Sequence, residues 1–379
     1  MTLALPPMRT LRLLTCALAS LTLASAVHAQ AATAGAKKPR KADSLSATGL
    51  KVVDSLPPSP LFTGDSLLTL TFTANIRQLR GDRADSVPYR WATMSYAGAD
   101  GKTVTVPMRA KTHGIWRLKN CNFPPLRLNA ANKTAKGTLF ENADKPKFVN
   151  ACRDNDSYEQ YVLQEMQLYR IYQLLTPLSH RVRALRVTYR DSASGKDEMT
   201  RHAFVFEDPE LMAARIGRGH LVKTKGATPD DIDNAQLALV YLFEYMIGNT
   251  DFSFNGLHNG ELVQKPDMSP VIPVAYDFDF AGAVNTPYAT VDPQLQRDIK
   301  RVRQRLFRGY CVLAPHFPDA IALFQAKKDA IYALYRDDIG KLLKPDIVKE
   351  TLEYFDEFYD SIRTPKDAER VFRNCVGTR

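Results

Sequence analysis

Hydrophobic and polar residues alternate along several short segments in the first half of the chain. Residues 67–72 read Leu-Leu-Thr-Leu-Thr-Phe and residues 103–106 read Thr-Val-Thr-Val, with Gly and Asp turns between them. This β-branched alternation is typical of half-buried strands. Further strand candidates are residues 125–128, 147–149, 182–189 and 202–206. The pattern predicts an antiparallel sheet that begins near residue 61.

Helical spacing of apolar residues interrupts the sheet once and dominates after Glu207. Residues 157–175 predict one long helix with Glu165 near its middle. A second strong helix is expected from Thr228 as N-cap and Pro229 at the first helical position, to Gly248 as C-cap. Further helices are expected at residues 209–216, 291–309, 317–340, 345–362 and 366–374.

The N-terminal 60 residues do not resemble a folded domain. In residues 1–29, Arg9 and Arg12 lead into an apolar stretch that ends in Val-His-Ala, which is typical of a secretory signal peptide. Residues 30–60 are rich in Ala, then Lys and Arg, then Pro, and are expected to form a disordered linker. The expected domains are then residues 61–207, rich in strands, and residues 208–379, rich in helices. The signal peptide predicts export, either to the periplasm or outside the cell. No other segment approaches the length of a membrane span, so a membrane anchor is not expected.

Export to an oxidising compartment would allow the cysteines to form disulfides. Four remain after the signal peptide, and in an oxidising compartment they are expected to form two disulfides. Three pairings are possible, and we favour the local one, Cys121 with Cys152 and Cys311 with Cys375. None of the four has the close spacing that zinc sites favour.

The chain is basic, with a net charge of +10 that loses two units if Arg9 and Arg12 are removed. Such a charge favours acidic partners without choosing among them. The densest basic run extends from residue 297 to residue 308 and is expected to form an amphipathic helix. A solvated helix face is the favoured interpretation of this run, and an anion-binding patch is the alternative.

Polar residues with the chemistry of phosphoryl transfer gather in the second half. Asp251 follows the helix that ends at Gly248, Asn259 precedes one apolar strand, and Asp277 ends another. If the two strands form one hairpin, Asn259 and Asp277 face each other. Mg²⁺ or Mn²⁺ is commonly held by such oxygens together with nucleotide phosphates, and a nearby carboxylate positions the acceptor. Asp279 is a possible further metal ligand or a turn cap, and each Asp can also be read as an ordinary turn residue.

These motifs resemble those of the atypical kinase-like group that includes the CotH and HipA kinases. Gly-Asn-Thr-Asp at residues 248–251 is similar to the catalytic-loop motif of HipA kinases, and Tyr276-Asp277 resembles their metal-binding block. The order of segments from Arg109 to Glu165 is similar to that of the CotH N-terminal lobe.

The resemblance implies an α+β, two-lobe protein-kinase-like fold. Its N-terminal lobe would be an antiparallel sheet with one helix, and its C-terminal lobe would be mainly helical. By the same resemblance, Lys147 would contact phosphates and pair with Glu165, and Glu207 would lie near the hinge. Asp251 would be the catalytic residue, whereas Asn259 and Asp277 would bind metal.

The sequence departs from this group at several points. It has no G-x-G-x-x-G loop, and residues 109–114 are only a possible substitute. Asn255 competes with Asn259 for the metal-binding role. The phosphate-binding role of Lys147 has rivals in Lys145, Arg127 and Lys119.

Three functions follow as hypotheses. The first is an exported transferase that uses ATP or another nucleotide, with Mg²⁺ or Mn²⁺, to modify a protein or glycan, with no role for nucleic acid. The second is a pseudokinase-like scaffold without catalysis. The third treats Asp277 and Asp279 as the nucleophile pair of a phosphatase-like Rossmann domain, but the repeated strand and helix units of such a domain are missing.

Overall fold

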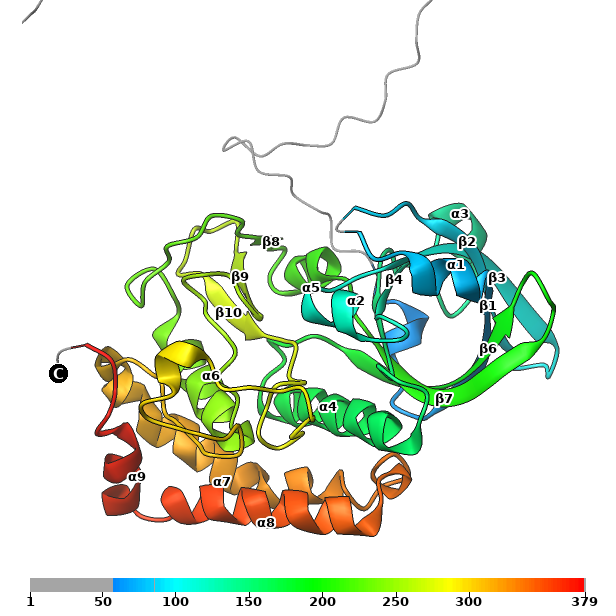
Figure 1. The fold of residues 1–379 in the computed structure, drawn as a ribbon. Helices are drawn as coiled ribbons and strands as arrows, with labels where there is room; N and C mark the ends of the chain where they lie inside the picture. The colour runs from blue at the N-terminus through cyan, green and yellow to red at the C-terminus, as the bar shows by residue number, and fades with distance from the viewer. Residues whose placement is uncertain (1–56, 85, 378–379) are drawn as a thin grey trace, which may run out of the picture. The chain divides into compact units, whose positions relative to one another are not determined.

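The computed structural model describes residues 57–84 and 86–377 (Figure 1). The expected signal peptide, residues 1–29, and nearly all of the expected linker lie outside these residues. Within them, the chain builds one strand-rich part and one helix-rich part, each with its own hydrophobic core.

Seven strands close into a barrel in the order β1-β2-β3-β4-β5-β7-β6. Neighbours pair antiparallel, except that β6 and β1 pair in parallel, from Leu68 opposite Leu185 to Ala74 opposite Asp191. Alternate side chains of these strands fill the interior, where the rings of Phe72, Phe148 and Tyr189 pack together. The strands are β1 (Leu68–Ala74), β2 (Arg90–Ala97), β3 (Thr103–Thr112), β4 (Leu126–Asn129), β5 (Lys147–Asn150), β6 (Val182–Asp191) and β7 (Asp197–Phe206).

The helix α4 (Asp156–Leu175) joins the barrel to the second core. It packs against β7 on one side and α7 (Phe317–Ala333) on the other, so it is buried around most of its circumference. Strand β7 serves both cores, because Ala203 and Val205 face the barrel interior while Phe204 and Phe206 pack towards α4.

The second core also holds a small sheet of three strands, in the order β10-β9-β8. Its strands are β8 (His220–Leu221), β9 (Gly260–Gln264) and β10 (Ile272–Ala275). The main helices around them are α5 (Pro209–Arg215), α6 (Asn234–Ile247), α8 (Pro345–Ser361) and α9 (Pro365–Phe372), together with α4 and α7. Short helices α1 (Ile76–Gly81), α2 (Trp116–Asn120) and α3 (Asn132–Ala135) decorate the barrel.

The predicted two-lobe kinase-like fold, with an N-terminal antiparallel sheet and a mainly helical C-terminal lobe, is therefore wrong. The N-terminal strands form a closed, mixed barrel, and the parallel pair of β1 with β6 closes it. The two strands of that pair are more than 100 residues apart, and their local alternation does not reveal which partner each will take.

Two predicted helix assignments also fail. Thr228 does not cap a helix, because its N–H and hydroxyl bind the Asp231 carboxylate in a turn, and α6 begins later with Asp233 as its N-cap. The basic run at 297–308 contains no helix. Arg305 donates to the carbonyl of Met246 and Arg308 to that of Phe252, so the run follows the neighbouring loops instead.

Other local predictions are confirmed. Gly248 ends α6 in the left-handed conformation, with φ of 68°. The disulfides Cys121–Cys152 and Cys311–Cys375 form in the favoured local pairing. Among residues 57–84 and 86–377, we find no helix with the length and apolar character that a bilayer crossing requires.

Candidate functional site

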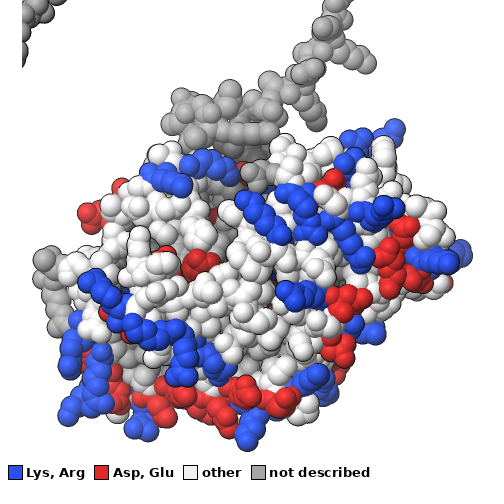
Figure 2. Space-filling view, in the orientation of Figure 1, with Lys and Arg blue, Asp and Glu red and all other residues white. Residues whose placement is uncertain are grey.

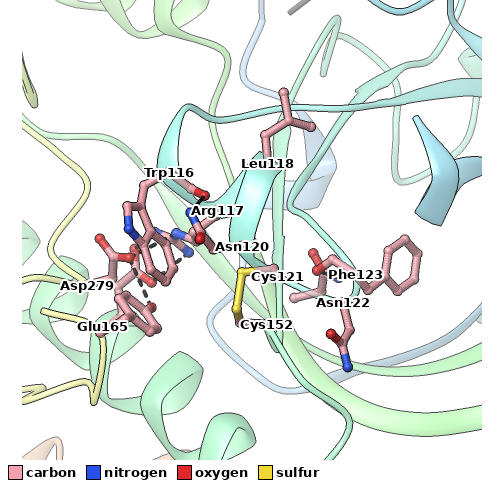
Figure 3. Close-up of a disulfide and its surroundings, with 12 residues drawn as sticks. Trp116, Arg117, Leu118, Asn120, Cys121, Asn122, Phe123, Cys152, Glu165 and Asp279 are labelled. Carbon is pink, nitrogen blue, oxygen red and sulfur yellow. Dashed lines mark hydrogen bonds and ion pairs between the residues drawn. A yellow bond between two sulfur atoms is a disulfide. The ribbon is translucent and has the colours of Figure 1, made fainter. Parts of the chain in front are cut away.

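A buried arginine organises the centre of the candidate site. The guanidinium of Arg117, on α2, contacts three carboxylates at once. Figure 3 shows it beside two of them, Glu165 and Asp279. Both terminal nitrogens bind Glu165 of α4, at 3.1 and 3.3 Å, one of them also reaches Asp277 Oδ1 at 2.5 Å, and Nε lies 3.0 Å from Asp279 Oδ2. Arg117 is only 8% exposed and Glu165 only 2%. The planar, five-donor fork of arginine suits such multiple pairing.

The position of Arg117 depends on how α2 is held. The Cys121–Cys152 disulfide ties the end of α2 to the segment that enters α4, the helix that carries Glu165. Arg83 donates to the carbonyls of Leu118, Cys121 and Asn122, which would otherwise end the short helix without partners. The two chain segments that supply Arg117 and Glu165 are thus joined covalently.

One guanidinium cannot neutralise three carboxylates, and the pKa values show this. Burial and then repulsion from Asp277 and Glu165 raise the pKa of Asp279, whose Oδ2 also accepts from Tyr288. Burial raises the pKa of Glu165 to about 7. Burial also opposes ionisation of Asp277, but the charges of Arg117 and Lys147 outweigh it and lower the pKa of Asp277. Asp277 therefore carries the negative charge that faces the cavity.

A cavity of about 650 Å³ opens beside this cluster, a volume that suits a small-molecule ligand. Its walls come from the loop before α2, from β4, β5 and β7, and from the segments around Asp251 and Asp277. Polar groups gather on those walls among apolar and aromatic ones. The cationic side chains that line it are Arg117, Arg127, Lys147 and Lys223, and the carboxylates are Asp208, Glu210, Asp251, Glu261, Asp277 and Asp279.

Lys147 lines this cavity but does not pair with Glu165, because Glu165 pairs with Arg117 instead. Its ammonium lies 4.4 Å from the ring centre of Tyr276 and 4.9 Å from that of Phe206. Burial lowers the pKa of Lys147, although Glu261 opposes the shift. Of the rival cations, Arg127 also lines the cavity, whereas Lys145 pairs with Asp144 outside it and Lys119 is not among the lining residues.

Asp251 and Asn259 form one hydrogen-bonded unit. The Nδ2 of Asn259 donates to the backbone carbonyl of Asp251 at 2.7 Å and to its Oδ2 at 3.1 Å. His258 Nε2 lies 2.9 Å from Asp251 Oδ1, and this hydrogen bond raises the pKa of His258. Asn255 instead donates to Ala227 and is not among the cavity-lining residues, so Asn259 is the better placed of the two asparagines.

The predicted β9–β10 hairpin brings Asn259 and Asp277 to the same wall. Ala275 pairs with Gly260, and the N–H of Tyr276 donates to the carbonyl of Asn259. Asn259 and Asp277 both have left-handed backbones, with φ of 49° and 64°, which is uncommon outside glycine and is concentrated at functional sites. The N–H of Asp277 is held by the hydroxyl of Tyr169 on α4.

The remaining predicted residue, Glu207, does not line the cavity. It follows β7 and forms an ion pair with Arg215 of α5 at 2.7 Å. The next residue, Asp208, does line the cavity and caps α5. Glu207 is thus part of the connection between β7 and α5.

Sequence reasoning missed Arg117, His113 and Glu261. Burial and the charges of Lys147 and Arg127 lower the pKa of His113 to about 3, so the ring is neutral in this cavity. Glu261 pairs with the buried His180 at 2.9 Å. The one available signal for Arg117 was its place four residues before a disulfide cysteine, which would limit its freedom to move.

The site offers few side chains that could ligate a metal ion. Within the part of the chain that the structure describes, no group of three or more His, Cys, Asp or Glu side chains is arranged to hold a metal ion. Asn259 and Asp277 could still offer one amide oxygen and one carboxylate, a set that Mg²⁺ accepts when phosphates and water complete its shell. Asp279 is less suitable, since Arg117 and Tyr288 share its Oδ2.

Replacing Arg117 by Met should destabilise the protein by about 3–5 kcal/mol at pH 7, because three carboxylates would lose their shared cation. The loss should shrink towards pH 4, where those carboxylates bind protons. Chemical denaturation at both pH values measures it. The control is Arg190→Met, which breaks an exposed ion pair with Asp197 and should change stability little. Equal effects of the two substitutions would contradict the central role of Arg117.

Glu244 in the last turns of α6 predicts a second pH effect. Its side chain is 1% exposed and neither carboxyl oxygen has a hydrogen-bond partner among the described residues. Burial raises its pKa from 4.5 to about 8, although the charge of Arg308 opposes the shift. The folded protein therefore holds a proton that the unfolded chain releases between these pH values.

The free energy of unfolding of the wild type should accordingly fall as pH rises from about 5 to about 8. Relative to Glu244→Gln, the slope should approach about 1.4 kcal/mol per pH unit. The matched control is Glu353→Gln on the exposed face of α8, which should run parallel to the wild type. Parallel curves for Glu244→Gln and wild type would show that Glu244 does not titrate in this way.

No family model matches the sequence, and no curated protein matches it either.

Proposed function

We propose that the cavity binds a nucleotide together with Mg²⁺ or Mn²⁺ and transfers a phosphoryl or nucleotidyl group to an exported protein or glycan. One observation carries the proposal. Asp251, Asn259 and Asp277 meet on one wall of a cavity that is also lined by the buried Lys147 and the half-buried Arg127. These residues come from segments up to 150 residues apart in the sequence, so their convergence is a product of folding.

The cations supply the phosphate-binding half of the proposal. Lys147 and Arg127 both line the cavity, and neither forms an ion pair with a carboxylate within the described residues. Lys147 is buried and Arg127 half-buried, and cations without carboxylate partners in such places favour the binding of an anion, whose phosphate oxygens match their donors. The rings of Phe206 and Tyr276 give the cavity the apolar surface on which a nucleobase can stack.

The acidic wall supplies the transfer half. A bound divalent ion would neutralise charge on the phosphate oxygens, and Asn259 and Asp277 are the residues that would hold it. Asp251 is partly exposed and fixed by His258 and Asn259, so it can accept the proton of an acceptor hydroxyl. The hydroxyl oxygen would form a bond to phosphorus while the bond from phosphorus to the leaving oxygen breaks.

The two disulfides support export, since such bonds persist in oxidising compartments. The periplasm or the exterior of the cell is therefore the proposed location, and the acceptor is sought there. The resemblance to CotH and HipA kinases now rests on the motifs around Asp251 and Asp277 alone.

A second candidate function, binding without catalysis, is favoured by one observation. Arg117 occupies oxygens of both Asp277 and Asp279, so a metal ion would have to compete with a buried guanidinium. A cavity whose acidic wall is already neutralised can bind a ligand without a metal.

Isothermal titration of the disulfide-intact protein with ATP, with and without Mg²⁺ or Mn²⁺, separates these functions. The transferase proposal expects binding that metal strengthens at least about tenfold and that loses this dependence in Asp277→Asn. Asp251→Asn should bind nucleotide and lose about a hundredfold or more of any transfer activity. The control is Asp100→Asn in the exposed turn between β2 and β3.

Metal-independent binding of ATP, unchanged in Asp277→Asn, would favour the second candidate. Failure of the folded wild type to bind ATP or other nucleoside triphosphates under any of these conditions would reject the transferase.

A further inference from the structure

A second cavity lies along the segment that follows Asp251. Its volume is about 510 Å³, and residues 252–255 form part of its wall while Asp251 itself lines the larger cavity. Consecutive Cα atoms are about 3.8 Å apart, so Asn255 is at most about 15 Å from Asp251. A ligand beside residues 252–255 would therefore lie close to Asp251, the proposed catalytic residue.

Aromatic side chains form part of the wall of the second cavity. The ring of Tyr241 lies 5.4 Å from that of Phe252, 6.4 Å from that of Phe254 and 5.8 Å from that of Tyr310. These three pairs have interplanar angles of 56°, 73° and 89°. Tilted and edge-to-face pairs of this kind are favoured between aromatic rings, and they give the cavity an aromatic wall against which a bulky apolar side chain can pack.

Arg308 joins this cavity to the Asp251 segment. Its Nη1 donates to the carbonyls of Thr250 at 2.5 Å and Phe252 at 3.0 Å, the residues on either side of Asp251. Its Nε and Nη2 have no partner among the described residues, and the side chain lines the cavity. The guanidinium thus keeps free donors for an anionic group.

The charged residues that line the cavity are Asp298 and Arg308, and the chain beside Asp298 carries exposed cations. Leu295 and Asp298 line it, and they belong to the irregular segment that also carries Arg297, Lys300 and Arg301. None of these three cations forms an ion pair within the described residues, and all three are exposed. Figure 2 shows Lys and Arg side chains in a band over the segment between β10 and α7, in contrast to the acidic row along α8.

The basic run at residues 297–308 also packs on the turn that follows Asp279. A Cβ placed on Gly282 would lie only 2.5 Å from the carbonyl oxygen of Val302 and 3.0 Å from the Cα of Arg303. The segment is therefore fixed against the chain just after the acidic wall of the larger cavity. The predicted amphipathic helix is absent from this basic run, whereas its cations Arg297, Lys300 and Arg301 are exposed to solvent.

We propose that this face docks the acceptor, and that the acceptor is an acidic polypeptide segment with an aromatic or large apolar residue. The bulky side chain occupies the second cavity, and the acidic residues lie against Arg308 and the basic segment, defined as Arg297, Lys300 and Arg301. The identification of this segment as the acceptor rests on the proposed transferase. The docking surface itself is independent of nucleotide binding. Complementary charge would fix the direction of the bound segment. The aromatic residue in the cavity would fix the register of that segment along the surface.

Fluorescence polarisation with labelled synthetic peptides tests the docking surface without nucleotide. The probe is a twelve-residue peptide of Glu and Gly with one central Phe, and the matched peptides carry Ala in place of Phe or Lys in place of Glu. The Phe and Glu peptide should bind at least about tenfold more tightly than either. Its affinity should fall as salt rises.

Two variants locate the surface. Arg297→Glu with Arg301→Glu should weaken binding at least about tenfold by reversing charge on the basic segment. Leu295→Trp should weaken it by filling the cavity. The matched control is Lys341→Glu with Lys349→Glu, two exposed residues that do not line the cavity, which should change affinity less than about twofold. Thermal unfolding of each variant confirms that it is folded.

Absence of peptide binding by the folded wild type would overturn the proposal. So would equal binding of the Phe and Ala peptides, or tighter binding of heparin fragments or anionic lipid vesicles, because each would remove the role of the aromatic cavity. Peptide binding as expected in a protein that binds no nucleotide would keep the docking surface and reject the transferase, so the two failures are distinguishable.

Discussion

The contact of Arg117 with three buried carboxylates is the constraint on which the candidate site depends. Glu165 comes from α4, whereas Asp277 and Asp279 come from the turn after β10, so one guanidinium joins the barrel to the second core. Each carboxylate would be costly to bury alone, and together they exceed the charge of one arginine. The excess raises the pKa values of Glu165 and Asp279 and leaves Asp277 as the ionised group that faces the cavity.

The fold supplies this contact from parts that are far apart in sequence. The barrel closes through the parallel pairing of β1 and β6, and its wall strand β7 gives α4 a surface on which to pack. The Cys121–Cys152 disulfide then fixes α2 against the entrance to α4. A left-handed backbone at Asp277, held by the hydroxyl of Tyr169, turns the acidic residues towards Arg117. Secondary structure, covalent bond and strained turn thus act together on one cluster of charges.

Local features could be predicted from the sequence, but long-range pairings could not. The long helix α4, the cap at Gly248, the β9–β10 hairpin and the two disulfides follow from periodicity, turn chemistry and cysteine spacing. The hairpin also places Asn259 beside Asp277. Closure of the barrel depends on which distant strands pair. Glu165 pairs with Arg117 and not with Lys147 because the Cys121–Cys152 disulfide fixes α2 beside α4. Both are tertiary facts that a local pattern does not encode. The basic run at 297–308 failed as a helix for the same reason, since distant backbone carbonyls bind its arginines.

The central claim is that this charge cluster is the acidic wall of a nucleotide and metal site. Anomalous diffraction from a crystal of the mature protein grown with Mn²⁺ and a non-hydrolysable ATP analogue tests it most directly. The account predicts a manganese peak about 2.0–2.3 Å from oxygens of Asp277 and Asn259, with the phosphates beside Lys147 and Asp277 released from Arg117. Nucleotide bound without a manganese peak, or no nucleotide in the cavity while Arg117 still holds all three carboxylates, would contradict it.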